Sequence, residues 1–330
     1  MKNLIVFFEK HPFMGVELLD MLSNNYYLLS YYDDDCYRML KSLGYPVLAY
    51  GSTNYLKIID SDEAVADILA DKSYRDNVIK YNTKQTKALF FYMNKKIDRL
   101  CQEQKIKMAL TPYNIQEKLG YKLFLHNICK RLGVEVNKTK NIYPADGDLH
   151  EIYKECKIEL SVPFVLQGSL GVSGEDTFIV KSFDEFTKLC KKSQGSVRAS
   201  KYLKNVIPLS VHICITTKDI LYEGPYIQII GFKVLSRNPF QFLGNDTNQK
   251  ILPEEMKNKV KSSSISLALY AKKLGYRGIL GVDFLWDKDS NRVFAQEINS
   301  RLVGLTRLLT GIQKEQKIVP HLIRHLNEFI

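Results

Sequence analysis

The feature that most constrains the fold is a pair of strand-like segments near the carboxyl end of the chain. "GILGVDFLWD" (278–287) and "RVFAQEIN" (292–299) are rich in β-branched and aromatic residues, and the turn-forming "KDSN" joins them. Because alternate side chains of a strand point to the same side, the sequence predicts a β-hairpin with one apolar face. The residues that we expect on that face are Val282, Phe284, Trp286, Phe294 and Ile298.

The opposite face of this hairpin gathers polar groups of different chemistry. Asp283 lies on the first arm, and Glu297, Asn299 and Arg301 follow at every second position from the second arm onward. Neighbouring carboxylates repel each other, so they require a cation or raised pKa values. Carboxylate and amide oxygens suit Mg²⁺, and a guanidinium beside them can stabilise a phosphoryl group in transfer. The alternative is the solvated face of an edge hairpin with an ordinary Glu–Arg pair.

The composition bounds the class of protein. The chain has 330 residues, 45% of them hydrophobic and 25% charged, which is ordinary for a globular protein. Its formal net charge of +11 suits polyanionic ligands such as nucleotides, acidic proteins or nucleic acid. No apolar run has the length of a membrane span or of a signal-peptide core. Six scattered cysteines argue against a disulfide framework and a cysteine zinc site. We expect a cytoplasmic protein.

About the first hundred residues alternate strand-like and helix-like segments, which predicts a parallel α/β layer. We expect strands at 3–8, 26–32, 45–51 and 105–112. We expect helices at 13–22 and throughout the polar stretch 70–104. No GxGxxG motif follows the first strand, so this part is not an obvious dinucleotide-binding domain.

The remaining chain begins with a helical pattern at 114–136 that Gly133 can end. The segments 137–148 and 240–249 have the composition of loops. Further helices are expected at 182–194 and 253–276, and further strands at 196–205, 209–217 and 226–235.

A glycine-rich hairpin is predicted at "VPFVLQGSLGVSGEDTFIV" (162–180), around Gly168, Gly171 and Gly174. Such a hairpin can fold over phosphates, because glycine N–H groups approach an anion without obstruction by side chains. The alternative is that these glycines serve backbone geometry alone.

Several other polar residues have a plain structural interpretation. His321 and His325 have the spacing of a metal pair, but a solvated helix face is the better interpretation without a third ligand. His126 and His212 are expected to be hydrogen-bonded histidines of the core. The row 33–35 of aspartates is expected to be a solvated turn that caps the next helix.

The order of these elements resembles the ATP-grasp family, and "GYRGILGVDFL…QEINSR" is the most specific part of the resemblance. It covers about residues 112–330, and the region before it is similar to a pre-ATP-grasp domain. The resemblance implies an α/β (α+β) fold with a parallel pre-ATP-grasp domain at 1–111. An ATP-grasp domain would follow at 112–330, with nucleotide bound between two α+β subdomains, of which the lid subdomain spans about 163–205.

The resemblance also implies roles for the residues that match the family's motifs. Asp283, Glu297 and Asn299 match the ligands of Mg²⁺, with Mn²⁺ as an alternative ion. Arg301 matches the arginine that stabilises the transition state. Lys122 matches the basic residue that opens the helix before the lid.

The nucleotide itself would lie between a hinge and the glycine hairpin. In "SKYLKN", backbone groups of Tyr202 and Leu203 match those that bind the adenine edge. The lid residues that the resemblance implies are Ser169, Gly171, Ser173 and Gly174.

One position departs from the family's pattern. The strand before the lid usually carries a lysine for the phosphates, and here the residue is Gln167. A neutral amide donates a hydrogen bond without charge, so Lys201 or Arg198 substitutes for the lysine or nucleotide binding is weaker. This change and "PYIQIIGF" (225–232) together resemble amino-acid and peptide ligases of natural-product biosynthesis.

The function that the resemblance implies is an ADP-forming ligase. ATP would activate the carboxylate of an amino acid or small peptide as an acyl phosphate, which an amine then attacks. One alternative is thioester formation on an acidic carrier protein, and a second is a nucleotide-binding sensor or scaffold without catalysis. The sequence contains no basic run with interleaved aromatic residues, so it does not indicate a nucleic-acid partner. No feature of the sequence indicates an oligomeric state.

Overall fold

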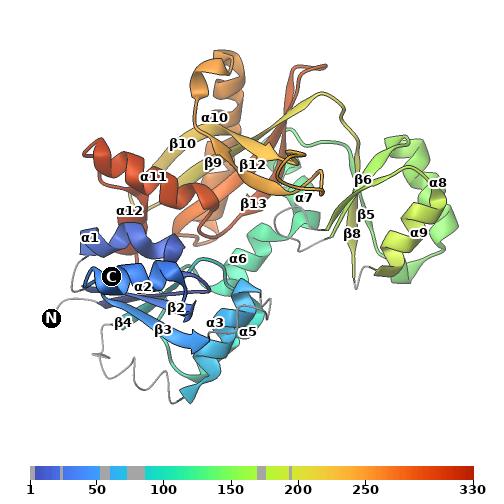
Figure 1. Ribbon diagram of the computed structural model, residues 1–330. Coiled ribbons are helices and arrows are strands. Elements are labelled where there is room, and N and C mark those ends of the chain that lie inside the picture. Colours follow the sequence, from blue (N-terminus) through green and yellow to red (C-terminus); the bar gives the residue numbers. More distant parts are fainter. Residues whose placement is uncertain (1–3, 23–24, 53–59, 73–85, 169–175, 193–194) are drawn as a thin grey trace.

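The computed structural model describes residues 4–22, 25–52, 60–72, 86–168, 176–192 and 195–330. Within these ranges the strands form three sheets, one parallel and two antiparallel, each accompanied by helices (Figure 1). The predicted α/β (α+β) class is therefore confirmed. All six cysteines are free, as expected. Among the described residues, no helix combines the length and the apolar character needed to cross a bilayer.

The first sheet is parallel and has the strand order β3-β2-β1-β4. Its strands are β1 (Leu4–Glu9), β2 (Tyr26–Tyr32), β3 (Val47–Ser52) and β4 (Thr86–Phe90). Its helices are η1 (Pro12–Leu18), α1 (Leu19–Leu22), α2 (Asp35–Ser42), α3 (Ser61–Ala70) and α5 (Lys95–Glu103). The first three strands lie where the sequence predicts them.

Two predictions in this region are wrong. The stretch 70–104 is not helical throughout, because Ala88, Leu89 and Phe90 form a buried apolar run that pairs with β1 as strand β4. The segment 105–112 contains a single bridge, from Met108 to Ala88, in place of a strand.

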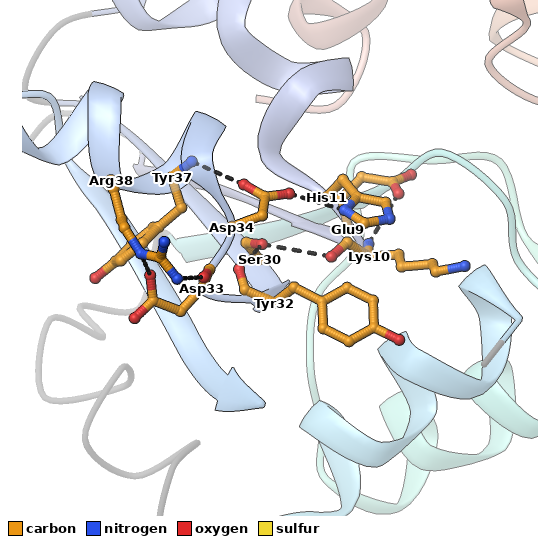
Figure 2. A network of polar contacts seen from close by, with 9 residues as sticks. All are labelled: Glu9, Lys10, His11, Ser30, Tyr32, Asp33, Asp34, Tyr37 and Arg38. Atoms are coloured by element: carbon orange, nitrogen blue, oxygen red, sulfur yellow. Dashed lines mark hydrogen bonds and ion pairs between the residues drawn. The ribbon is translucent and has the colours of Figure 1, made fainter. Parts of the chain in front are cut away.

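The aspartates after β2 confirm the expected helix cap, as Figure 2 shows. Asp34 accepts a hydrogen bond of 2.9 Å from the backbone N–H of Tyr37 in the first turn of α2. The same carboxylate lies 2.8 Å from Nδ1 of His11, and Arg38 pairs with Asp33 at 3.1 Å. These contacts fix the turn between β2 and α2.

The second sheet follows helices α6 (Tyr113–Gly120) and α7 (Lys122–Leu132) and has the order β5-β8-β6-β7. Its strands are β5 (Thr139–Ile142), β6 (Phe164–Gly168), β7 (Thr177–Val180) and β8 (Val197–Lys201). The helical elements with it are η3 (Pro144–Asp146), α8 (Leu149–Leu160) and α9 (Phe183–Lys192). Figure 1 shows this sheet, with α8 and α9 against it, set apart from the other two. We call it the lid sheet, after the lid subdomain that the sequence predicts at about 163–205.

The glycine hairpin of the sequence is confirmed as β6 and β7, which pair antiparallel. Gly133 ends α7 in a left-handed conformation (φ 67°), as expected. The predicted helix at 114–136 is divided, however, because Tyr121 between α6 and α7 has an extended backbone. The predicted loop at 137–148 contains strand β5, so that part of the prediction is wrong.

The third sheet is antiparallel and has the order β11-β10-β9-β12-β13. Its strands are β9 (Val206–Ile215), β10 (Ile220–Ile230), β11 (Phe242–Asp246), β12 (Gly278–Asp287) and β13 (Arg292–Asn299). The helical elements are η4 (Gln249–Ile251), α10 (Glu254–Lys273), α11 (Gly304–Glu315) and α12 (His321–Asn327). The arms of the closing hairpin have the predicted bounds, whereas β11 lies in the segment 240–249 that was predicted as a loop.

The closing hairpin contains a β-bulge that the sequence does not reveal. Asp283 lies opposite Glu297, but Phe284 lies opposite Ala295, so Gln296 is an extra residue on β13. The bulge reverses the alternation, and Phe294 pairs with Leu285 on the side of Asp283. Ala295, and not Phe294, packs in the apolar core with Val282 and Phe284. The prediction that Phe294 lies on the apolar face of the hairpin is therefore wrong.

The histidines of α12 are buried, which contradicts the predicted solvated face. His321 Nδ1 lies 3.2 Å from Nδ1 of His212, a core histidine as expected. His325 accepts a hydrogen bond from the backbone N–H of Ile279 and donates one to the carbonyl of Ala109. His126, in contrast, is exposed on α7 and not part of the core.

Helix α12 also joins the N-terminal layer to the rest of the chain. Its Leu322 and Leu326 are buried in the same apolar cluster as the strands of the first sheet. Helix α11, which packs against α12, also contacts η1 of that layer. The division at residue 111, and the lid subdomain at about 163–205, stay predictions.

The buried histidines predict a loss of stability on acidification. Burial lowers the pKa of His325 from 6.5 to about 4, and that of His321 equally. Between pH 6.5 and about pH 4 these histidines bind protons in the unfolded chain but not in the folded protein. The free energy of unfolding should therefore fall by roughly 1.4 kcal/mol per histidine for each pH unit below 6.5 in this range. Urea unfolding followed from neutral to acid pH measures this slope.

Two variants isolate the contribution of α12. His325→Gln should reduce the slope, and His126→Gln, at an exposed position, should leave it unchanged. Equal slopes in all three proteins would contradict the explanation.

Candidate functional site

A cavity of about 600 Å³ is lined by the lid sheet and the third sheet together. Gln167 and Thr177 of the lid sheet line it on one side, and Ser210 and Asp283 of the third sheet on the other. Every predicted site residue within the described ranges borders this cavity. These residues are Lys122, Gln167, Lys201, Tyr202, Leu203, Asp283, Glu297, Asn299 and Arg301. Ser169, Gly171, Ser173 and Gly174 lie outside the described residues.

The two carboxylates of the closing hairpin face each other in the cavity wall. Asp283 is directly opposite Glu297 in the strand register. Burial, and then the neighbouring Glu297, raise the pKa of Asp283 from 3.8 to about 6. Hydrogen bonds from Ser210 and from Nδ2 of Asn299 (2.9 Å) oppose this rise. Such a pair has the charge and the oxygen ligands that a divalent cation needs.

Asn299 connects the carboxylate pair to Arg301. Its amide nitrogen donates to Asp283, and its amide oxygen accepts a hydrogen bond of 3.1 Å from Nη2 of Arg301. Nη1 of Arg301 donates to the carbonyl of Leu302 at 3.2 Å. The guanidinium is therefore held at the cavity wall beside the acidic pair.

Aromatic residues from the N-terminal layer complete the surroundings of Arg301. The guanidinium carbon lies 5.8 Å from the ring centres of both Phe91 and Tyr92, which directly follow β4. The sequence prediction missed these residues, because 70–104 was predicted to be helical. A strand ending in two aromatic residues was the signal, since parallel sheets place ligand sites at the carboxyl ends of their strands.

Two buried cationic side chains lie close to Glu297. Nζ of Lys122, at the start of α7, is 3.6 Å from Oε1 of Glu297, and its side chain is 6% exposed. Arg198 on β8 is also buried, and its Nη2 donates a hydrogen bond of 2.7 Å to Oε1 of Gln167. The cations offset the charge of the carboxylates without lying in solvent.

The predicted hinge forms another part of the wall. The side-chain amide of Asn137 donates to the carbonyl of Lys201 at 2.7 Å, which fixes the backbone before Tyr202 and Leu203. Apolar residues of both sheets line the cavity as well, among them Val165, Ile179 and Leu285. A planar, mostly apolar base fits such a wall better than a charged group does.

Comparison with known proteins gives a distant sequence relative. No family model matches the chain. A carbamoyl-phosphate synthase of Methanobrevibacter smithii is 29% identical over 199 residues, which cover 54% of this chain and 48% of that protein. The chain thus spans about half the length of the curated relative that it matches.

The structural comparison decides the fold. Biotin carboxylase of Campylobacter jejuni, solved as a β,γ-ATP complex, matches with a TM-score of 0.75 at 15% identity, over 100% of this chain and 72% of that one. The chain has the ATP-grasp fold.

Two further proteins with the ATP-grasp fold show how widely it matches. The biotin carboxylase domain of Hydrogenobacter thermophilus 2-oxoglutarate carboxylase, solved with MgADP and bicarbonate, has a TM-score of 0.72 at 18% identity over 99% of this chain and 70% of that one. An L-amino acid ligase of Bacillus licheniformis has a TM-score of 0.60 at 16% identity over 100% and 74%. The ATP-grasp fold of this chain includes the N-terminal layer, since these matches cover nearly all of it.

The coupling of the acidic pair predicts a change in one pKa. In Glu297→Gln the pKa of Asp283 should fall from about 6, but not to its ordinary value, because burial is the larger cause. Carbon-13 NMR of the aspartate carboxyls measures it. Glu135→Gln, at an exposed position paired with Arg292, is the matched control. An unchanged pKa in Glu297→Gln would show that the carboxylates are not coupled.

Proposed function

We propose that this chain is an ATP-dependent, ADP-forming ligase that activates a carboxylate as an acyl phosphate and joins it to an amine. The observation that carries the proposal is the acidic pair of Asp283 and Glu297 with Arg301 held beside it in one cavity wall. The similar structures include an L-amino acid ligase and biotin carboxylases, which supports this class of reaction. The amino acid or small peptide remains our proposed acid.

The metal site of the proposal consists of Asp283, Glu297 and Asn299. Bound Mg²⁺, or Mn²⁺ in its place, would neutralise the charge of the phosphates. The donor set fits this ion, because Asp283 and Glu297 lie opposite each other and, with the amide of Asn299, offer the oxygen ligands that Mg²⁺ prefers. Lys122 pairs with Glu297 at 3.6 Å and would orient its carboxylate.

The other residues of the cavity bind and orient the substrates. Tyr202 and Leu203 would hold the adenine through backbone groups, with Lys201 beside them. Arg301 would stabilise the charge on the phosphoryl group as it moves to the carboxylate. Activation by ATP and attack by an amine require no side-chain nucleophile. Positioning and charge therefore supply most of the rate enhancement.

The proposal also assigns a role to each of the two predicted domains. Residues 112–330 would bind nucleotide and metal, and 1–111 would contribute Phe91 and Tyr92 to the acceptor side of Arg301. We expect small-molecule partners and a cytoplasmic location. A carrier-protein thiol as acceptor, and a sensor without turnover, are distinguished by the assay below.

ADP release tests the reaction directly. The protein is incubated with ATP, MgCl₂ and pools of amino acids, ADP is measured with coupled enzymes, and products are identified by mass spectrometry. Release should require one acid and one amine together. Glu297→Gln should lower kcat by roughly 10³-fold while the circular dichroism spectrum is retained. The control Glu135→Gln should be as active as wild type.

The outcomes separate the candidate functions. Tight ATP binding without ADP release under any condition would favour the sensor. Release only with a thiol acceptor would favour thioester formation. Unimpaired release by Glu297→Gln would refute the metal site.

The pKa of Asp283 predicts how metal binding depends on pH. Below about 6 the carboxyl is protonated, and a metal ion has to displace that proton. The affinity for Mn²⁺ in the presence of ATP, measured by electron paramagnetic resonance, should rise about tenfold per pH unit up to pH 6 and then level off. A flat profile between about pH 5 and pH 7 would contradict the assignment of Asp283.

A further inference from the structure

We infer that Arg198 is a positioning residue of the nucleotide cavity, which holds the amide of Gln167 with its NH₂ group available to a phosphate oxygen. Arg198 also retains, below the surface, the positive charge that a lysine at position 167 would carry into the cavity. The inference deepens the proposed function and rests on it. It explains how a neutral residue serves where the ATP-grasp pattern has a lysine.

Arg198 links two walls of the cavity from beneath. It lies opposite Gln167 in the register of β6 and β8, and its Nη2 donates to Oε1 of that amide at 2.7 Å. Its Nη1 donates at 3.0 Å to the carbonyl of Gln296. Gln296 is the bulge residue directly before Glu297. One guanidinium therefore connects the lid sheet to the backbone beside the acidic pair.

This contact determines the orientation of the Gln167 amide. A guanidinium can only donate hydrogen bonds, so the oxygen of Gln167 has to face Arg198. The amide nitrogen then lies on the other side, 3.3 Å from Oγ1 of Thr177. Gln167 and Thr177 both line the cavity, whereas Arg198 does not. The cavity consequently meets an N–H donor, as an anionic ligand requires.

The buried charges explain why the side chain at 167 is neutral. Arg198 is 4% exposed, and its Nε has no partner among the described atoms. Burial lowers the pKa of Arg198, and the nearby Glu297 opposes that shift. A lysine at 167 would bring an ammonium against this guanidinium and remove the oxygen that accepts from it. Like charges so close together repel strongly where water is scarce.

A double-mutant cycle on the two facing residues tests the inference. Dissociation constants for ATP and for adenosine are measured by calorimetry for wild type, Gln167→Lys, Arg198→Met and the double variant. Each single variant should weaken ATP binding about tenfold, whereas the double variant should return to within about threefold of wild type. In the double variant the lysine supplies the charge and meets no guanidinium. Adenosine affinity should stay constant, because it lacks phosphates.

Controls keep the test decisive. Arg131→Met removes an exposed guanidinium of α7 that does not line the cavity, and it should bind ATP like wild type. If Arg198→Met does not fold, Arg198→Lys is measured as a single variant outside the cycle; it keeps the charge but not the two-donor fork, and should weaken ATP binding severalfold.

Three results would overturn the inference. The first is ATP binding by Gln167→Lys alone that equals or exceeds wild type. The second is a parallel loss of ATP and adenosine affinity, which indicates a merely structural role. The third is equal ATP affinity of wild type and all variants. Wild-type protein that binds no ATP would instead overturn the proposed function itself.

Discussion

The opposition of Asp283 and Glu297 across β12 and β13 is the constraint to which the surrounding structure responds. Two carboxylates this close destabilise each other when both are ionised, and burial makes the repulsion stronger. The ion pair of Lys122 with Glu297 offsets part of this repulsion, and so do the hydrogen bonds that Ser210 and Asn299 donate to Asp283. Burial, and then the charge of Glu297, still raise the pKa of Asp283 to about 6. A cation bound between the two carboxylates would relieve their repulsion.

The bulge at Gln296 gives this pair its connection to the lid sheet. An extra residue on β13 releases a carbonyl from the ladder next to Glu297, and Arg198 binds that carbonyl. The lid sheet and the acidic pair thereby share one buried guanidinium. A displacement of β6 or β8 would also shift the backbone beside Glu297, since these strands carry Gln167 and Arg198.

The sequence predicts the closing hairpin with its bounds, because its alternating pattern is long and two chemically distinct faces support it. The strands that sequence reasoning missed are β4, β5 and β11, and each lies at the edge of its sheet. Edge strands are short and partly polar, so local composition resembles that of a loop or solvated helix. The bulge was missed for another reason: a strict period of two leaves no place for Gln296. The buried state of His325 depends on Ala109 and Ile279, partners that spacing within α12 cannot reveal.

Of the site, the acidic pair, Asn299 and Arg301 followed from spacing and resemblance together. Phe91 and Tyr92 did not, because their approach to Arg301 depends on how the N-terminal layer packs against the third sheet. Arg198 was considered only as a substitute for a lysine. Its contact with Gln296 required the three-dimensional register.

The packing of α12 against the first sheet has a consequence for folding during translation. Leu322 and Leu326 belong to the apolar cluster of the first sheet, although the strands of that sheet lie between residues 4 and 90. Domains generally fold in the order in which the ribosome releases them. Here the strands of the first sheet are synthesised before α12, so part of their apolar surface stays uncovered until α12 has left the ribosome. During that interval the exposed apolar surface of the first sheet is prone to aggregation.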